Sequence, residues 1–380
     1  MLKTVVSIIL SFAVLLSLNS NDIYKNDVSN RLIIQGIGID QNEDDTYKIT
    51  VQAINTSTHT ASINENSGDT VKIYTVSGDT IYTALKSIAE FEGKIPMYSQ
   101  NRVIIIGRNI AKSGIDGVID FFNRDADSGP SVLVACAEKS AEEILSQKKE
   151  GEVIARNIDF ALQSSDFEGG MYKMQMYELI DKFKGNGSFL MPLLVSKEQS
   201  KGVHTVEVSG SLLFKNGKEF KEITKEKTFA FNLLNNTIYN GEFVFTLKDN
   251  EKISLSIADC KTKRQLKITD NEPHFSFKIN MECDISEIYG GVDKYLTKDK
   301  IEQIKNASEK HIENITMKFI GEYYNDEICD ALGVYRLIYG KYPKFYKENQ
   351  KNINTILENS KYSVDVKIRI RRVGHDYIKM

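Results

Sequence analysis

The residues that could do chemistry begin with two glycines near the start of the chain. The stretch IIQGIGID places Gly36 and Gly38 at the spacing that opens a dinucleotide-binding loop. Such a loop needs a third glycine three residues later and a helix after it. Gln41 occupies that position, and the residues that follow are typical of a strand. The pattern therefore favours a strand that twists or bulges at its glycines over a phosphate-binding loop.

Histidine and cysteine show no spacing that would hold a metal ion. Structural zinc sites use Cys and His ligands at short, regular intervals, and the sequence contains neither a CxxC pair nor an HExxH motif. His311 stands beside an apolar helical stripe and is interpreted as a surface residue. The candidates are scattered along the chain: His59, His204, His274, His311, His375, Cys136, Cys260, Cys283 and Cys329.

Nucleophilic and acid–base chemistry has equally little support in the sequence. No GxSxG motif marks a serine nucleophile, and the spacing of 52 acidic residues singles out no general acid and base. Cys260 and Cys283 are expected on neighbouring strands and could form a disulfide in an oxidising space, although four free thiols are slightly favoured. The sequence thus predicts no catalytic, cofactor-binding or metal-binding residue, which favours a binding or structural role.

A basic run near the C-terminus, KIRIRR, allows two interpretations. Lys367, Arg369, Arg371 and Arg372 could form a patch for anionic lipid headgroups, because clustered basic side chains are attracted to a negative surface. The favoured alternative is the solvated face of a strand whose charges resist edge-to-edge pairing.

The N-terminal segment resembles an export signal. After Lys3, residues Val5 to Leu18 carry no charge, and this run is too short to cross a bilayer comfortably, since a spanning helix needs roughly 20 apolar residues. Its length and flanks fit a secretory signal, but the cleavage site is poor because Leu18 is not small. Export is favoured over a buried N-terminal helix.

The composition describes an ordinary globular protein of 380 residues, long enough for two or three domains. A formal net charge of −3 gives no reason to expect nucleic-acid binding. Hydrophobic patterning predicts strands at 31–40, 47–57, 71–78, 102–107 and 131–137, with helices between the later ones. Ser77 or Asp79 is expected to cap the helix that starts near residue 80. This order predicts a mixed sheet with packed helices.

The second half is predicted to be mainly β-structure with one long helix. Strands are expected at 204–214, 237–247, 252–268 and 274–288, with a helix over 224–236. A stripe from Ile301 to Tyr323 predicts a long amphipathic helix whose apolar side is more consistent with core than with a partner surface. A further helix over 328–343 is expected to end at Pro343, and a two-sided strand follows at 362–372. The predicted fold class is α+β, with a C-terminal antiparallel sheet.

In the order of its segments, the chain resembles the Ger(x)C family of spore germination lipoproteins, the C subunits of nutrient germinant receptors. The resemblance extends from about Arg31 to Val373. Six short stretches carry it: GIGID at 36–40, RVIIIG at 102–107, GIDGVIDFFNRD at 114–125, VSGSLLFKNGK at 208–218, ALGVYRLIYGKYPKFYK at 331–347 and VDVKIRIRRVG at 364–374.

The resemblance implies a three-domain mixed α/β protein at the outer leaflet of the spore inner membrane. It also implies two integral-membrane partners, one A-type and one transporter-like B-type subunit, and no enzymatic activity or cofactor. Combined with a boundary expected at 197–201, it divides the chain into four parts. These are a signal or anchor (1–21), an N-terminal α/β domain (22–140), a mainly helical middle domain (141–200) and a C-terminal α+β domain (201–380).

One departure from the family pattern concerns lipid attachment. Family leaders end in a cysteine that receives diacylglycerol, and the equivalent position lies near Asp22, where there is no cysteine. No lipidation site is therefore predicted, and an uncleaved leader that acts as an anchor is preferred over retention by partners or secretion. The predicted function is a non-enzymatic extracytoplasmic subunit of a germinant receptor. The alternative is an exported solute-binding protein that captures a nutrient between its domains.

Overall fold

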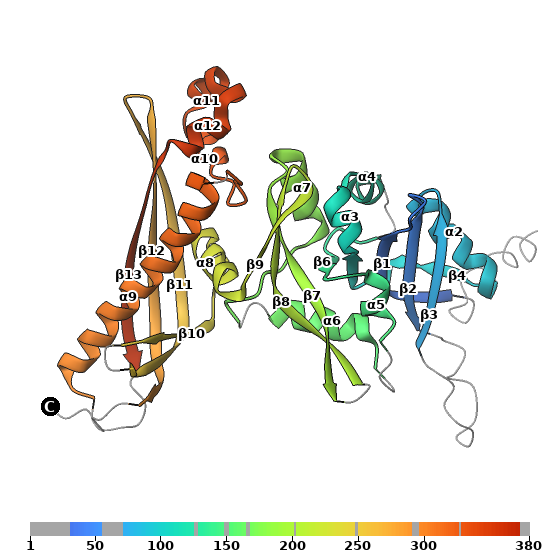
Figure 1. Cartoon of the computed structure of the whole chain (residues 1–380), viewed down its shortest axis with the longest axis horizontal. Helices are drawn as coiled ribbons and strands as arrows, with labels where there is room; N and C mark the ends of the chain where they lie inside the picture. The colour runs from blue at the N-terminus through green and yellow to red at the C-terminus, as the bar shows by residue number, and fades with distance from the viewer. Residues whose placement is uncertain are drawn as a thin grey trace, which may run out of the picture.

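The computed structural model describes residues 31–54, 71–124, 128–147, 152–164, 168–200, 203–247, 250–290, 296–326 and 328–372. Two β-sheets with their helices lie side by side along the molecule, the first sheet at the N-terminal end and the second at the C-terminal end (Figure 1). The leader and Asp22 lie outside the described residues. No helix in the described part of the chain is long and apolar enough to cross a membrane.

The first sheet has nine strands and mixed pairing, as the predicted fold class requires. Its order is β3-β2-β1-β5-β6-β7-β8-β9, with the short β4 also beside β1. The pairs of β1 with β5, β5 with β6 and β6 with β7 are parallel, and the outer pairs are antiparallel. The strands are β1 (Arg31–Gln41), β2 (Tyr47–Ile54), β3 (Val71–Gly78), β4 (Ile95–Met97), β5 (Val103–Ile106), β6 (Leu133–Ala137), β7 (Phe189–Ser200), β8 (Val203–Lys215) and β9 (Lys218–Ile223).

Helices cover both faces of the parallel centre of this sheet. The apolar run of β5 is buried throughout, because its side chains enter two separate cores. Ile104 and Ile106 pack with helices on one face, and Val103 and Ile105 pack with α5 and α6 on the other. The helices are α2 (Ile81–Glu92), α3 (Arg108–Ser113), α4 (Asp116–Arg124), α5 (Ala141–Leu145), α6 (Ile154–Gln163) and α7 (Met176–Gly185).

The β7–β8 hairpin crosses the boundary that was predicted at 197–201. Phe189 pairs with Phe214 and Ser200 with Val203, so the first sheet continues from one side of that boundary to the other. Residues 141–200 contribute three helices and β7 to the sheet that residues 31–137 begin. The division of the chain into a middle and a C-terminal domain remains a prediction.

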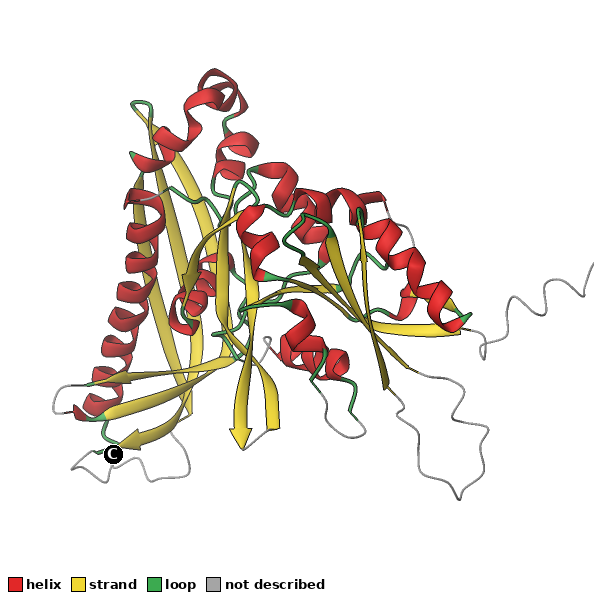
Figure 2. Cartoon of the chain, turned by 45° about the vertical axis from the view of Figure 1, so that its right-hand side comes forward, coloured by secondary structure: helices red, strands yellow, loops and turns green. Residues whose placement is uncertain are grey.

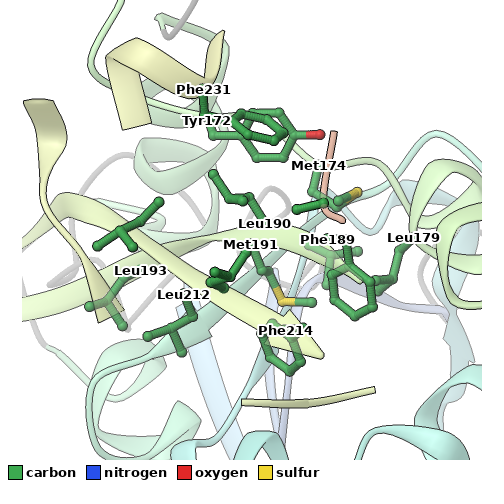
Figure 3. Close-up of a cluster of buried hydrophobic side chains, with 14 of the residues drawn as sticks. Tyr172, Met174, Leu179, Phe189, Leu190, Met191, Leu193, Leu212, Phe214 and Phe231 are labelled. Carbon is green, nitrogen blue, oxygen red and sulfur yellow. The ribbon is translucent and has the colours of Figure 1, made fainter. Parts of the chain in front are cut away.

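A dense cluster of apolar side chains joins β7 and β8 to α7 and α8 (Lys225–Asn235). The rings of Phe189 and Phe214 stack with centroids 4.8 Å apart, and Tyr172 meets Phe231 of α8 edge-on at 5.4 Å. Figure 3 shows this cluster: Tyr172, Met174, Leu179, Phe189, Leu190, Met191, Leu193, Leu212, Phe214 and Phe231. Helix α8 therefore links the two sheets through the core as well as through the chain.

The second sheet contains β10 (Gly241–Thr246), β11 (Lys252–Thr269), β12 (Glu272–Tyr289) and β13 (Lys361–Arg372) in that order. Its first three strands are antiparallel, as predicted, but β13 runs parallel to β12, so the sheet is not antiparallel throughout. Alternation in β12 is confirmed: Phe275, Phe277, Ile279 and Met281 are all buried on one face. The long helix is also confirmed as α9 (Lys298–Ile320), which runs along the long strands and contacts β13 (Figure 2).

The segment after α9 departs from its prediction. Residues 328–334 are not helical, and the helix begins only at α10 (Tyr335–Lys341). Helix α10 does end just before Pro343, as predicted, and Pro343 is itself the first residue of α11 (Pro343–Asn349), a position where its missing N–H costs nothing. Helix α12 (Ile353–Glu358) completes this region before β13.

Candidate functional site

A polar cleft of about 530 Å³ lies between α7 and the end of α8. The residues before α7 and its first turns form one side, including Tyr172, Tyr177 and Lys182. The end of α8 and the residues that follow it form the other side, including Asn235 and Tyr239. Because α7 packs on the first sheet and α8 leads into the second, the cleft lies where the two sheets meet.

Lys182 carries a charge in a partly buried position of the cleft lining. Its side chain is half-buried, and burial lowers the pKa of its ammonium group. Glu178, one helical turn earlier, acts in the opposite direction, while Arg336 and Arg264 lower the pKa further. Among the described residues, the Lys182 ammonium has neither a hydrogen-bond nor an ion-pair partner. The fold therefore takes this charge partly out of water without a direct ion pair, while the charges of Glu178 and Asp181 favour its protonated form.

The two arginines near Lys182 already have hydrogen-bond partners. Arg336 of α10 donates to a carboxylate oxygen of Asp181 at 2.8 Å and to its backbone carbonyl at 3.3 Å. Arg264 of β11 donates to the carbonyls of Leu234 at 2.9 Å and Leu332 at 3.0 Å, and to the side chain of Asn235. These contacts connect the cleft wall to the second sheet.

A buried carboxylate organises the loop behind the cleft. Asp330 accepts hydrogen bonds from the hydroxyl of Tyr324 at 2.6 Å and from the backbone N–H groups of Val334 and Tyr335 at 2.8 and 3.0 Å. Burial raises the pKa of Asp330 despite these donors. The carboxylate holds residues 330–335 in a turn, which explains why the predicted helix does not begin at residue 328.

The glycines of GIGID have a packing role, as the sequence favoured. A side chain on Gly36 would approach the β-carbon of Ala155 to 2.7 Å, and one on Gly38 would approach that of Ala141 to 2.9 Å. The pairing register of β1 shifts between Ile34 and Gly36, which is the expected bulge. The glycines thus allow α5 and α6 to lie directly on β1.

Asp40, the last residue of GIGID, caps a helix. Its carboxylate accepts from the backbone N–H groups of Ala141 and Glu142, each at 2.9 Å, at the start of α5. Burial raises its pKa. This motif therefore positions a helix.

Two of the four basic side chains near the C-terminus pair with acidic residues of the neighbouring strand β12. Arg369 pairs with Glu282, and Arg371 donates to Asp284 at 3.0 and 3.2 Å. Val364 and Ile368 are buried on the opposite face of the same strand. These contacts fit the favoured interpretation, a solvated strand face, better than a lipid-binding patch.

All four cysteines are free thiols, and all four are buried. Burial raises the pKa of Cys260, Cys283 and Cys329 to about 12 each and raises that of Cys136 further. Cys260 lies opposite Met281 and Cys283 opposite Ile257, so the pair that could have formed a disulfide does not share a register position. Since the thiolate is the reactive form, these residues act as small core side chains.

His311 is not the surface residue that was predicted. Its ring is half-buried and stacks on Phe243 and Phe245 of β10, with centroid distances of 6.1 and 5.8 Å. Burial lowers its pKa. Within the described ranges no three His, Cys, Asp or Glu residues gather as a metal site. His59 and His375 lie outside those ranges.

The cleft residues carried no signal in the sequence. Lys182, Glu178 and Tyr177 belong to a helix with no motif, and Asn235 and Tyr239 lie more than 50 positions later. Only the packing of α7 against β7 and of α8 against β8 brings them together. The Tyr and Asn content of these segments is too ordinary to have identified them.

Two family models match the chain in succession. They describe the spore germination protein N-terminal domain over residues 24–196 and the spore germination B3/GerAC-like C-terminal domain over residues 209–374. The chain is 24% identical to spore germination protein GerQC of Bacillus cereus over 271 residues, which cover 70% of this chain and 73% of that protein. Spore germination protein KC of Bacillus subtilis (strain 168) is 22% identical over 384 residues, covering 92% of this chain and 91% of its own.

A solved structure is similar to nearly the whole fold. The crystal structure of the GerBC protein aligns with a TM-score of 0.59 at 18% identity, and covers 88% of this chain and 96% of its own. At this identity the similarity concerns the fold, which agrees with the mixed α/β arrangement of two sheets.

Proposed function

Because the chain belongs to the spore germination protein family whose N-terminal and GerAC-like C-terminal domains it contains in order, we propose that it is a non-enzymatic subunit of a spore nutrient germinant receptor. In this role it supports receptor assembly and nutrient-triggered germination at the extracytoplasmic face of the spore inner membrane. The observation that carries the proposal is the match of both family domains across nearly the whole chain.

The architecture supports a role in assembly. Arg264 links β11 to the end of α8 and to the turn before α10, and Arg336 links α10 to α7. The second sheet is thereby connected to two helices, α7 and α8, that pack on strands of the first. The thiols that could have served as nucleophiles are buried with raised pKa values. The expected partners are the A-type and B-type integral-membrane subunits.

Attachment to the membrane follows from the leader rather than from a lipid. A single acyl chain gives only marginal membrane binding, so a lipid anchor needs two chains, such as those of diacylglycerol. The position near Asp22 offers no thiol to which diacylglycerol could be attached. We therefore propose that the apolar segment from Val5 to Leu18 stays on the chain as an anchor and that the membrane subunits add further contacts.

Fractionation of spores that carry a C-terminally tagged copy tests this function. We expect the full-length chain in the inner-membrane fraction, with an intact mass that includes residues 1–21 and no lipid. The A-type and B-type subunits should co-purify in mild detergent, and deletion of the gene should slow nutrient-triggered germination while leaving germination by a non-nutrient trigger unchanged. A shortened chain free in the soluble fraction, with both membrane subunits present, would contradict the proposal.

A further inference from the structure

We propose that the cleft between α7 and the end of α8 binds a small solute that carries one carboxylate, with the ammonium group of Lys182 as its ion-pair partner. This binding site goes beyond the receptor-subunit role, and it can exist whether or not the chain assembles with membrane partners.

Within the described ranges, the ammonium group of Lys182 lacks an ion-pair partner. Moving an ammonium group out of water is costly unless another charge or hydrogen bonds compensate for it. Lys182 is half-buried, and its potential acidic partner Asp181 is already bound by Arg336 at 2.8 Å. No side chain of the described residues takes that place. A carboxylate that entered the cleft would supply the missing partner.

The size and lining of the cleft fit a small molecule. Small-molecule sites typically enclose about 300–1,000 Å³, and the volume here is about 530 Å³. Gln175, Asn235 and Thr237 offer amide and hydroxyl groups for a polar solute. Tyr177 and Tyr239 also line the cleft although 51% and 61% of each is exposed. Exposed rings beside a polar cleft provide flat surfaces for the carbon skeleton of a ligand.

The neighbouring charges limit the ligand to one negative group. Glu178 lies one helical turn before Lys182 and lines the same cleft. Asp181 and Lys173 also line the cleft, and Lys173 already has a partner. A second negative charge on the solute would therefore face the carboxylate of Glu178 without a further available ammonium group, and like charges repel. A monocarboxylate is therefore favoured over phosphate or a tricarboxylate.

Thermal unfolding of the purified full chain tests the site. The probes are the monocarboxylates lactate and gluconate, the uncharged lactamide, inorganic phosphate and citrate, all at equal ionic strength. A ligand that binds only the folded state raises the unfolding temperature in proportion to its occupancy. We expect lactate or gluconate to raise it and lactamide, phosphate and citrate to leave it unchanged.

Two substitutions on the same helix localise the effect. Lys182→Met should weaken the binding of the active monocarboxylate at least tenfold. Lys184→Met is the matched control, because Lys184 is exposed and donates to Asn123 at 2.6 Å outside the cleft. It should leave the affinity unchanged. An absence of any shift, or a shift that survives in Lys182→Met, would overturn the inference.

A second measurement on the unaltered protein avoids dependence on variant folding. Brief acetylation by acetic anhydride, read by mass spectrometry of peptides, reports the accessibility of each amine. The active monocarboxylate should protect Lys182 several-fold and should not protect Lys184. Unchanged acetylation of Lys182 at saturating probe would contradict the proposal. Membrane fractionation is unaffected by either result, so failure of this inference leaves the proposed receptor role standing.

Discussion

Gly36 and Gly38 show at the scale of single residues how a motif that suggests chemistry can serve packing. The two glycines place β1 against α5 and α6 with no side chain between them. Their effect on stability is therefore steric, and it can be measured separately from any ligand.

Gly36→Ala is expected to destabilise the fold by about 1–3 kcal/mol, the usual cost of overpacking a core. The added methyl group would lie 2.7 Å from the β-carbon of Ala155. Gly340→Ala in α10 is the matched control, since nothing lies within 4 Å of the added carbon. It should be neutral or stabilising by up to about 1 kcal/mol, because Ala favours helix. Denaturant unfolding measures both, and equal effects would contradict the steric explanation.

His311 is expected to make stability depend on pH. Its pKa is lowered on folding from 6.5, chiefly by burial, with Glu226 opposing. The unfolded chain therefore holds the proton more tightly, so the stabilising contribution is present above pH 6.5 and is lost as the pH falls toward the folded value. His311→Phe should lose less stability than the wild type between pH 8 and 5. If the free energy of unfolding depended on pH in the same way in His311→Phe and in the wild type, the assignment to His311 would be contradicted.

At the scale of elements, helix α2 shows where local sequence rules select the wrong cap. Either Ser77 or Asp79 was expected as the cap, but the helix begins after Thr80. The hydroxyl of Thr80 accepts from the N–H of Thr83, and the hydroxyl of Thr83 accepts from the N–H of Thr80. A Thr at the third position completes this reciprocal cap, a role more commonly filled by Glu or Gln.

Thr80→Ala should destabilise the protein by about 1 kcal/mol, the typical cost of losing an N-terminal cap. Asp79→Ala, one residue earlier and exposed, should change stability by less than about 0.5 kcal/mol. Urea unfolding of the two variants compares them directly. A larger loss in Asp79→Ala would restore the cap that the sequence suggested.

Replacing Arg264 tests the connection between α8 and the turn after α9. Arg264→Met removes a half-buried guanidinium and leaves the carbonyls of Leu234 and Leu332 without that donor. We expect a loss of about 2–3 kcal/mol, because hydrogen bonds to charged groups are strong and their buried partners remain unsatisfied. Lys263→Met, its exposed neighbour on the same strand, should change stability by less than about 0.5 kcal/mol. Similar losses would show that the connection is not specific.

At the scale of the whole molecule, periodic patterns predicted the elements better than their assembly. The apolar run of β5 and the alternation of β12 identified both strands correctly. A strand buried on both faces is apolar throughout, and a strand buried on one face alternates apolar and polar residues. His311 was misplaced because a helical stripe reveals its own core face but not the strand that packs beside it. The cleft was invisible because its residues come from segments that only tertiary contacts unite.

Fragments of the chain should show that β7 and β8 belong to one cooperative unit. A fragment of residues 31–200 leaves β7 without the partner that pairs with it from Phe189 to Ser200. A fragment of residues 31–236 retains β8, β9 and α8. We expect the longer fragment to be soluble and to unfold cooperatively, and the shorter one to aggregate through its exposed edge. Equal solubility and equally sharp unfolding would show that the hairpin is dispensable.

The same hairpin limits how relatives of this protein can exchange parts by recombination. The first family domain ends at residue 196 and the second begins at residue 209, so the crossover point between them divides a pair of bonded strands. The register of that pair shifts between Pro192 and Leu194 and again between Glu198 and Ser200. A hybrid gene made from two relatives would join β7 of one protein to β8 of the other, and the bulges of the two strands would come from different proteins. We therefore expect the two domains to be inherited as a matched pair.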